Sequence, residues 1–115
     1  MNTYDFMRMH INHRLAQAHT HTDERHPRLK LRVIGTEMVF LIAEAYSEEN
    51  GLYYGLCDLG AGVPEIGTFS LREIHDMADK HGLAIAINPV YESHDLDYYL
   101  NRSQHACARV TQELN

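Results

Sequence analysis

Apolar residues in the first part of the chain recur at helical spacing. The stripe consists of Tyr4, Met7, Ile11 and Leu15. Steps of three and four place these side chains on one face of a helix. Asn2 or Thr3 can cap its start, and the stripe ends at Ala18, where polar residues take over. We therefore predict an N-terminal helix with one buried side.

Beyond Pro27 the pattern changes to the period of two that strands show. Leu29, Leu31 and Val33 alternate with Arg28, Lys30 and Arg32. This alternation predicts a half-buried strand with a basic outer face. Met38–Tyr46 is apolar almost throughout, which predicts a central strand, and Leu52–Leu59 predicts a third. The Asn50-Gly51 pair between them is a strong hairpin signal, so we expect an antiparallel meander.

The segment Gly60–Gly67 is predicted to be a loop that the apolar residues Val63 and Ile66 anchor. A helix is predicted over residues 71–81, because the sequence from Ser70 has the S-x-x-E form of a capping box and Gly82 is placed to end the helix.

A short strand is predicted at Leu83–Ile87, and a long final helix from about His94. The apolar stripe of this helix comprises Leu96, Leu100, Ser103, Cys107, Val110 and Leu114. The helix either packs along its own sheet or forms a dimer seam between two copies of the chain.

Together these elements predict an α+β fold, with an antiparallel sheet of four or five strands and the N-terminal, middle and long C-terminal helices packed on it. A length of 115 residues with 44% hydrophobic residues suits a single domain, residues 1–115. No apolar run approaches the roughly 20 residues of a membrane span, and the first ten residues lack a signal-peptide stretch. We expect a cytoplasmic protein, in which Cys57 and Cys107 are thiols rather than a disulfide.

The net charge of -6 is unevenly distributed. Residues 1–34 carry six basic and three acidic groups, whereas residues 35–101 carry two basic and twelve acidic groups. Such an acidic segment repels phosphate backbones and attracts basic surfaces. Direct nucleic-acid binding is therefore disfavoured, and a basic partner protein is favoured.

Three motifs were considered as catalytic or metal sites. The histidines of residues 19–26, with Asp23, could bind zinc, and they resemble the ligand string of metallo-β-lactamase-like hydrolases. Glu24 stands where that motif needs histidine, so we expect a solvated loop and no bound metal. The glycines after Asp58 lack the lysine of a phosphate loop, and Ser70 lacks a G-x-S-x-G setting. We predict no catalytic residue and no cofactor, and hence a non-enzyme.

The acidic stretch supplies candidates for contact with a basic partner. Tyrosines within it could serve as amphipathic anchors. The predicted partner-binding residues are Asp58, Glu65, Glu73, Asp76, Asp79, Tyr53 and Tyr54.

The segment LYYGLCDLGAGVPEIGTFSLREI at residues 52–74, with RLKL at 28–31 and FLIAE at 40–44, resembles an uncharacterised family of short proteins. Its members share a consensus like LFGLCDLGxGxPELGxVSLxEL and are carried by plasmids, phages and integrative elements. The resemblance covers residues 28–87. It departs at residues 84–87, which are apolar where the family has charges, and both terminal regions look like additions.

The resemblance implies a mobile-element accessory protein that binds and inhibits a host defence complex, as anti-CRISPR and antirestriction proteins do. Its partner would be a basic, nucleic-acid-binding host protein. Two alternatives remain at this point. One is a small metal-dependent hydrolase that uses the histidines of residues 19–26, and the other is a structural or regulatory module that forms a homodimer through the C-terminal helix.

Overall fold

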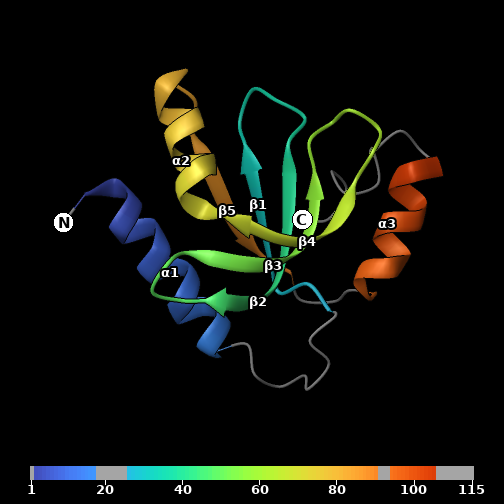
Figure 1. The fold of residues 1–115 in the computed structure, drawn as a ribbon, viewed down its shortest axis with the longest axis horizontal. Helices are drawn as coiled ribbons and strands as arrows, with labels where there is room; N and C mark the ends of the chain where they lie inside the picture. Colours follow the sequence, from blue (N-terminus) through green and yellow to red (C-terminus); the bar gives the residue numbers. More distant parts are fainter. Residues whose placement is uncertain (1, 18–25, 91–93, 106–115) are drawn as a thin grey trace.

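The computed structural model describes residues 2–17, 26–90 and 94–105, and in these ranges it shows three helices and five strands (Figure 1). In chain order they are α1 (Thr3–Gln17), β1 (Leu29–Val33), β2 (Val39–Ser47), β3 (Leu52–Asp58), β4 (Glu65–Ser70), α2 (Leu71–Lys80), β5 (Ile85–Pro89) and α3 (Leu96–His105). The predicted α+β class and the antiparallel meander are confirmed. None of the three helices is long and apolar enough to cross a membrane, as far as the described ranges extend.

The strands form one antiparallel sheet in the order β4-β3-β2-β1-β5. The central β2–β3 pair contains a bulge between Ile42 and Glu44. Opposite this bulge lies Gly55, where an added Cβ would overlap the Leu41 carbonyl oxygen. Glycine is needed there because the two backbones approach each other too closely for a side chain.

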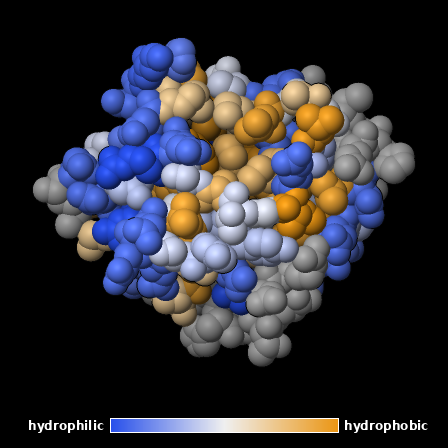
Figure 2. Space-filling model, in the orientation of Figure 1, coloured by the Kyte–Doolittle hydropathy of each residue, from blue (hydrophilic) through white to orange (hydrophobic). Residues whose placement is uncertain are grey.

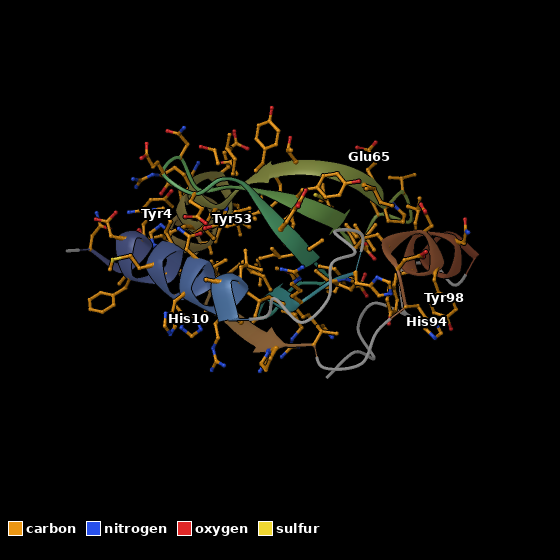
Figure 3. All side chains as sticks on the ribbon, turned by 90° about the horizontal axis from the view of Figure 1, so that it is seen from below. Tyr4, His10, Tyr53, Glu65, His94 and Tyr98 are labelled. Carbon is orange, nitrogen blue, oxygen red and sulfur yellow. The ribbon has the colours of Figure 1, made fainter. Side chains whose placement is uncertain are left out.

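Helices pack on both faces of the sheet, which gives three layers. Side chains such as Leu31, Phe40 and Tyr53 face α1 and α2, whereas Leu41 and Leu56 face α3. Figure 3 shows the sheet between α1 on one side and α3 on the other. Each fully buried leucine-sized side chain contributes about 1.5–3 kcal/mol, so the two apolar clusters account for how the three layers hold together.

Helix α1 buries the predicted stripe. Tyr4, Ile11 and Leu15 are buried against the sheet and α2. Asn2 caps the helix, because its side-chain oxygen accepts a hydrogen bond from the Asp5 N–H at 2.8 Å.

Strand β4 was not predicted, since Gly60–Gly67 was expected to be a loop throughout. The strand begins at Glu65, directly after Pro64, and contains Gly67. Both residue types weaken a strand signal. Pairing with β3, in which Leu56 lies opposite Ile66, supplies the stabilisation that the local sequence does not.

The last strand begins two residues later than predicted, because the backbone of Leu83 caps the end of α2 instead of pairing in the sheet. Gly82 has a φ of +67°, and the Leu83 N–H donates to the Ala78 carbonyl at 2.8 Å. This pairing across a left-handed glycine is a common helix terminator.

The described part of the C-terminal helix spans ten residues, Leu96–His105. The Asp95 side chain accepts a hydrogen bond from the Tyr98 N–H at 3.0 Å, which fixes the start of the helix. The predicted stripe residues Cys107, Val110 and Leu114 lie outside the described residues. The expectation of a long helix is therefore not supported.

The prediction that β1 has a basic outer face is wrong, because that face of the strand is covered. Lys30 and Arg32 lie on the α3 face, and Lys30 is only 1% exposed. Burial, together with the charge of Arg32, lowers the pKa of Lys30 from 10.5 to about 8.

Replacing the cap of α2 should destabilise the protein. Ser70 Oγ accepts a hydrogen bond from the Glu73 N–H at 3.2 Å, as the capping box predicts. Ser70→Ala should lower the free energy of unfolding by about 1 kcal/mol in urea titrations. Ser70→Asp should retain most of that stability, because aspartate is also a good cap. Equal midpoints for the wild type and Ser70→Ala would contradict the assignment.

Burial of Lys30 should also make stability depend on pH. Between about pH 8 and pH 10.5 the unfolded chain holds a proton that folded Lys30 has lost, so stability contributed at this site rises with pH. Lys30→Met should remove that part of the rise between about pH 8 and pH 10.5 in urea titrations. Lys80→Met, at an exposed position of α2, should retain it. An unchanged rise in Lys30→Met would contradict the burial.

Candidate functional site

The loop from β3 to β4 is fixed in place by a buried carboxylate. Asp58 is 1% exposed, and its Oδ1 accepts a hydrogen bond from the Gly60 N–H at 2.9 Å. Gly60 and Gly62 both have a φ of +81°, which favours glycine. A Cβ on Gly60 would lie 2.7 Å from the Cβ of Glu37, so the loop is packed against the β1–β2 turn.

This loop presents apolar side chains to water. Leu59 is 59% and Val63 is 72% exposed, and Ile34 in the neighbouring β1–β2 turn is 41% exposed. Figure 1 shows both connections at the same end of the sheet, and Figure 2 shows apolar surface over the β3–β4 loop. Val63 therefore does not anchor the loop as predicted; Pro64 is the buried residue of this segment.

The segment that carries these apolar residues is acidic. Residues 33–71 include six acidic residues and no lysine, arginine or histidine. Glu37 and Glu65 are both exposed, the first in the β1–β2 turn and the second at the start of β4. We define the loop surface as Ile34, Glu37, Leu59, Val63 and Glu65. It combines an apolar centre with an acidic edge.

The predicted partner-binding residues do not form one patch. Asp58 and Tyr53 are buried and Tyr54 is half-buried, whereas the acidic residues of β4 and α2 are exposed, namely Glu65, Glu73, Asp76 and Asp79. The Arg72 guanidinium lies 3.7 Å from the Tyr4 ring centroid, which places the start of α2 beside Tyr4. Figure 3 shows Tyr4 beside α1 and Glu65 on the side of the molecule toward α3. The structure thus separates Glu65 from the acidic residues at the start of α2.

Tyr53 has a structural role. Its hydroxyl donates a hydrogen bond to Asn12 Oδ1 at 2.6 Å, and burial raises the pKa of this phenol. Asn12 Nδ2 and Arg8 each donate to the Glu48 carbonyl at 3.3 Å. These bonds attach α1 to the β2–β3 turn, so Tyr53 supports the fold and is not available to a partner.

Cys57 lies opposite Glu65 in the β3–β4 pair. Burial, and to a smaller degree the Glu65 carboxylate, raises the pKa of the Cys57 thiol to about 11. A thiol with this pKa is protonated at neutral pH and is a poor nucleophile. The arrangement does not suit cysteine-based catalysis.

A chain of hydroxyl, imidazole and carboxylate groups joins α1 to α2, and it was not predicted from the sequence. Thr3 Oγ1 lies 3.0 Å from His75 Nε2, and His75 Nδ1 lies 3.2 Å from Asp76 Oδ1. The Asp76 side chain is 61% exposed, so water screens its charge. His75 also contacts the Tyr4 ring edge-on, with centroids 5.8 Å apart. We interpret the chain as a helix–helix contact.

The histidines of residues 19–26, which were expected to form a solvated loop, fall mostly outside the described residues, which resume at His26. Among the residues that are described, no three His, Cys, Asp or Glu side chains are grouped so that they could hold a metal ion.

The exposure of Leu59 and Val63 was not predicted from the sequence. The available signal was their position, since each is adjacent to a glycine on the side facing the loop centre. Glycine backbone can adopt the left-handed turns that direct flanking side chains outward.

Comparison with known proteins gives one match. The model of a family described as "Protein of unknown function (DUF2958)" matches residues 2–109. No curated protein and no solved structure matches. The matched range includes the His-rich region and much of the C-terminal segment, so these regions are not additions to the family scaffold, contrary to the expectation from the sequence. The chain belongs to this family of proteins of unknown function.

Proposed function

We propose that this protein is a binding protein, and that the loop surface contacts a basic partner protein. The observation that carries the proposal is the exposure of Leu59 and Val63 on a loop that the buried Asp58 holds in place. An apolar centre with a polar edge is the usual anatomy of a protein interface.

A fixed loop favours binding for an energetic reason. Apolar side chains gain about 1.5–3 kcal/mol each when they are fully buried. Ordering a flexible loop would offset part of that gain. The Asp58–Gly60 hydrogen bond restricts the loop before any partner arrives, so more of the gain is available for binding.

The charge of the segment favours a basic partner. Glu37 and Glu65 are exposed in the same two segments as the apolar residues, and the sequence of residues 33–71 contains six acidic residues and no basic one. Complementary charge steers association and selects partners. Proteins that bind nucleic acids have basic surfaces of this kind. The resemblance to proteins of plasmids and phages suggests a host defence complex, which the protein would inhibit as an anti-CRISPR or antirestriction protein.

Binding is favoured over catalysis by the state of the reactive groups. Burial keeps the Cys57 thiol protonated at neutral pH, and water screens the Asp76 carboxylate beside His75. Neither the Cys57 thiol nor the His75–Asp76 pair is therefore activated for nucleophilic catalysis.

The test compares two double variants that place the same charge on different exposed apolar pairs. Leu59→Asp with Val63→Asp alters the loop surface, whereas Phe6→Asp with Met9→Asp alters α1, where Phe6 is 66% and Met9 is 49% exposed. Immobilised proteins would be incubated with an extract of bacterial cells that contain an active restriction or CRISPR complex, and captured proteins would be identified by mass spectrometry.

We expect the wild type and the α1 variant to capture a basic, nucleic-acid-binding complex. The loop variant should lose at least about 2 kcal/mol of binding, which is roughly a thirtyfold weaker affinity. Association with the wild type should slow as salt rises. Equal capture by the two variants, with unfolding midpoints near that of the wild type, would contradict the proposal.

A further inference from the structure

Strand β4 forms one edge of the sheet. It pairs with β3 on one side, and no other described strand pairs with it. Figure 3 shows the helices beside the two faces of the sheet and β4 along its outer margin. In Figures 1 and 2 this edge faces the viewer.

The pairing register shows which backbone groups of β4 point outward. The Leu71 N–H donates to the Gly51 carbonyl at 2.9 Å, directly beyond the Leu52–Ser70 pair. Bonded and non-bonded pairs alternate along an antiparallel ladder. Glu65, Gly67 and Phe69 therefore direct their N–H and C=O groups toward β3, and the residues between them direct theirs outward. The outward-facing residues within the strand are Ile66 and Thr68.

This edge lacks the features that usually prevent further pairing. Proteins protect edge strands with lysine, proline or a bulge. Strand β4 contains neither residue, and its register with β3 has no shift. By contrast, the opposite edge strand β5 ends in Pro89.

We infer that β4 accepts an extended segment of the partner protein as a sixth strand, and that this segment carries basic side chains. Backbone groups of Ile66 and Thr68 would supply the hydrogen bonds. Glu65 at the start of the strand would select positive charge. The inference rests on the proposed function in taking the partner to be a protein. A second copy of this chain is disfavoured, because two edges from the acidic segment would repel each other.

The side chains along β4 also predict which residues the bound segment prefers. Glu65 and Gly67 lie on the face of α1 and α2, two residues apart. Space around Gly67 is open, since an added Cβ would meet nothing within 4 Å. A bound strand would therefore place a basic side chain opposite Glu65 and a large apolar side chain opposite Gly67, two positions apart.

The probe is a capped octapeptide in which threonine alternates with leucine and lysine, titrated into ¹⁵N-labelled protein. We expect the amide signals of Ile66 and Thr68 to shift and their hydrogen exchange to slow on binding. Two methylated peptides would be compared, each methylated at the backbone nitrogens of alternate residues, with the two alternating sets exchanged between them. The peptide whose methylated N–H groups would face β4 should bind at least about tenfold more weakly. The other peptide, whose methylated positions point away from β4, serves as the matched control.

Thr68→Pro removes an outward N–H that does not pair with β3, so the sheet should survive. This variant should bind the peptide at least about tenfold more weakly than Thr68→Ala, which keeps the N–H. If Thr68→Pro fails to fold, the two methylated peptides still decide the question with the wild-type protein.

Equal binding of both methylated peptides, or shifts confined to residues 59–63, would overturn the inference. Loss of peptide binding in the Leu59→Asp, Val63→Asp variant would also overturn it, because the peptide would then occupy the loop surface. Self-association of the free protein that Thr68→Pro abolishes would assign the edge to a second copy and overturn the choice of partner. Peptide binding that survives in the loop variant supports the inference, even where that variant disproves the proposed role of the loop.

Discussion

The hydrogen bond between the buried Asp58 carboxylate and the Gly60 N–H is the interaction on which the candidate site depends. It holds the backbone at the point where β3 ends and the chain turns through the left-handed conformations of Gly60 and Gly62. The close packing of Gly60 on Glu37 joins this loop to the β1–β2 turn. Exposed Leu59 and Val63 are thereby held at one end of the sheet.

The buried Asp58 lies on the same face of the sheet as the basic residues of β1. Arg32 pairs with Val39, and Val39 pairs with Asp58, so the three residues form one row across β1, β2 and β3. Lys30 lies on this face as well. Asp58 therefore shares this face of the sheet with the two basic side chains of β1. Lys30 and Arg32 thus lie on the α3 face of the sheet, and neither belongs to the loop surface.

Local rules predicted the elements whose stabilising contacts lie close in sequence. Ser70 caps α2 through the Glu73 N–H three residues away, and the alternation of residues 28–33 identified β1, which begins one residue later, at Leu29. Strand β4 depends on pairing with β3. Its glycine and the preceding proline are atypical of strands, so the local sequence did not predict it. Burial of Asp58 and exposure of Val63 depend on how two connections meet, so neither follows from polarity or from the loop sequence alone.

The loop surface and the edge of β4 are continuous, because Glu65 belongs to both. Binding at this continuous surface therefore requires a loop that is ordered before a partner binds. ¹⁵N relaxation measures this directly. We expect backbone order parameters of about 0.85 for residues 59–63 in the free wild type, as in the strands, and values below about 0.6 in Asp58→Ala with the strands unchanged. A loop that is already mobile in the wild type, or one that stays ordered in Asp58→Ala, would contradict the account.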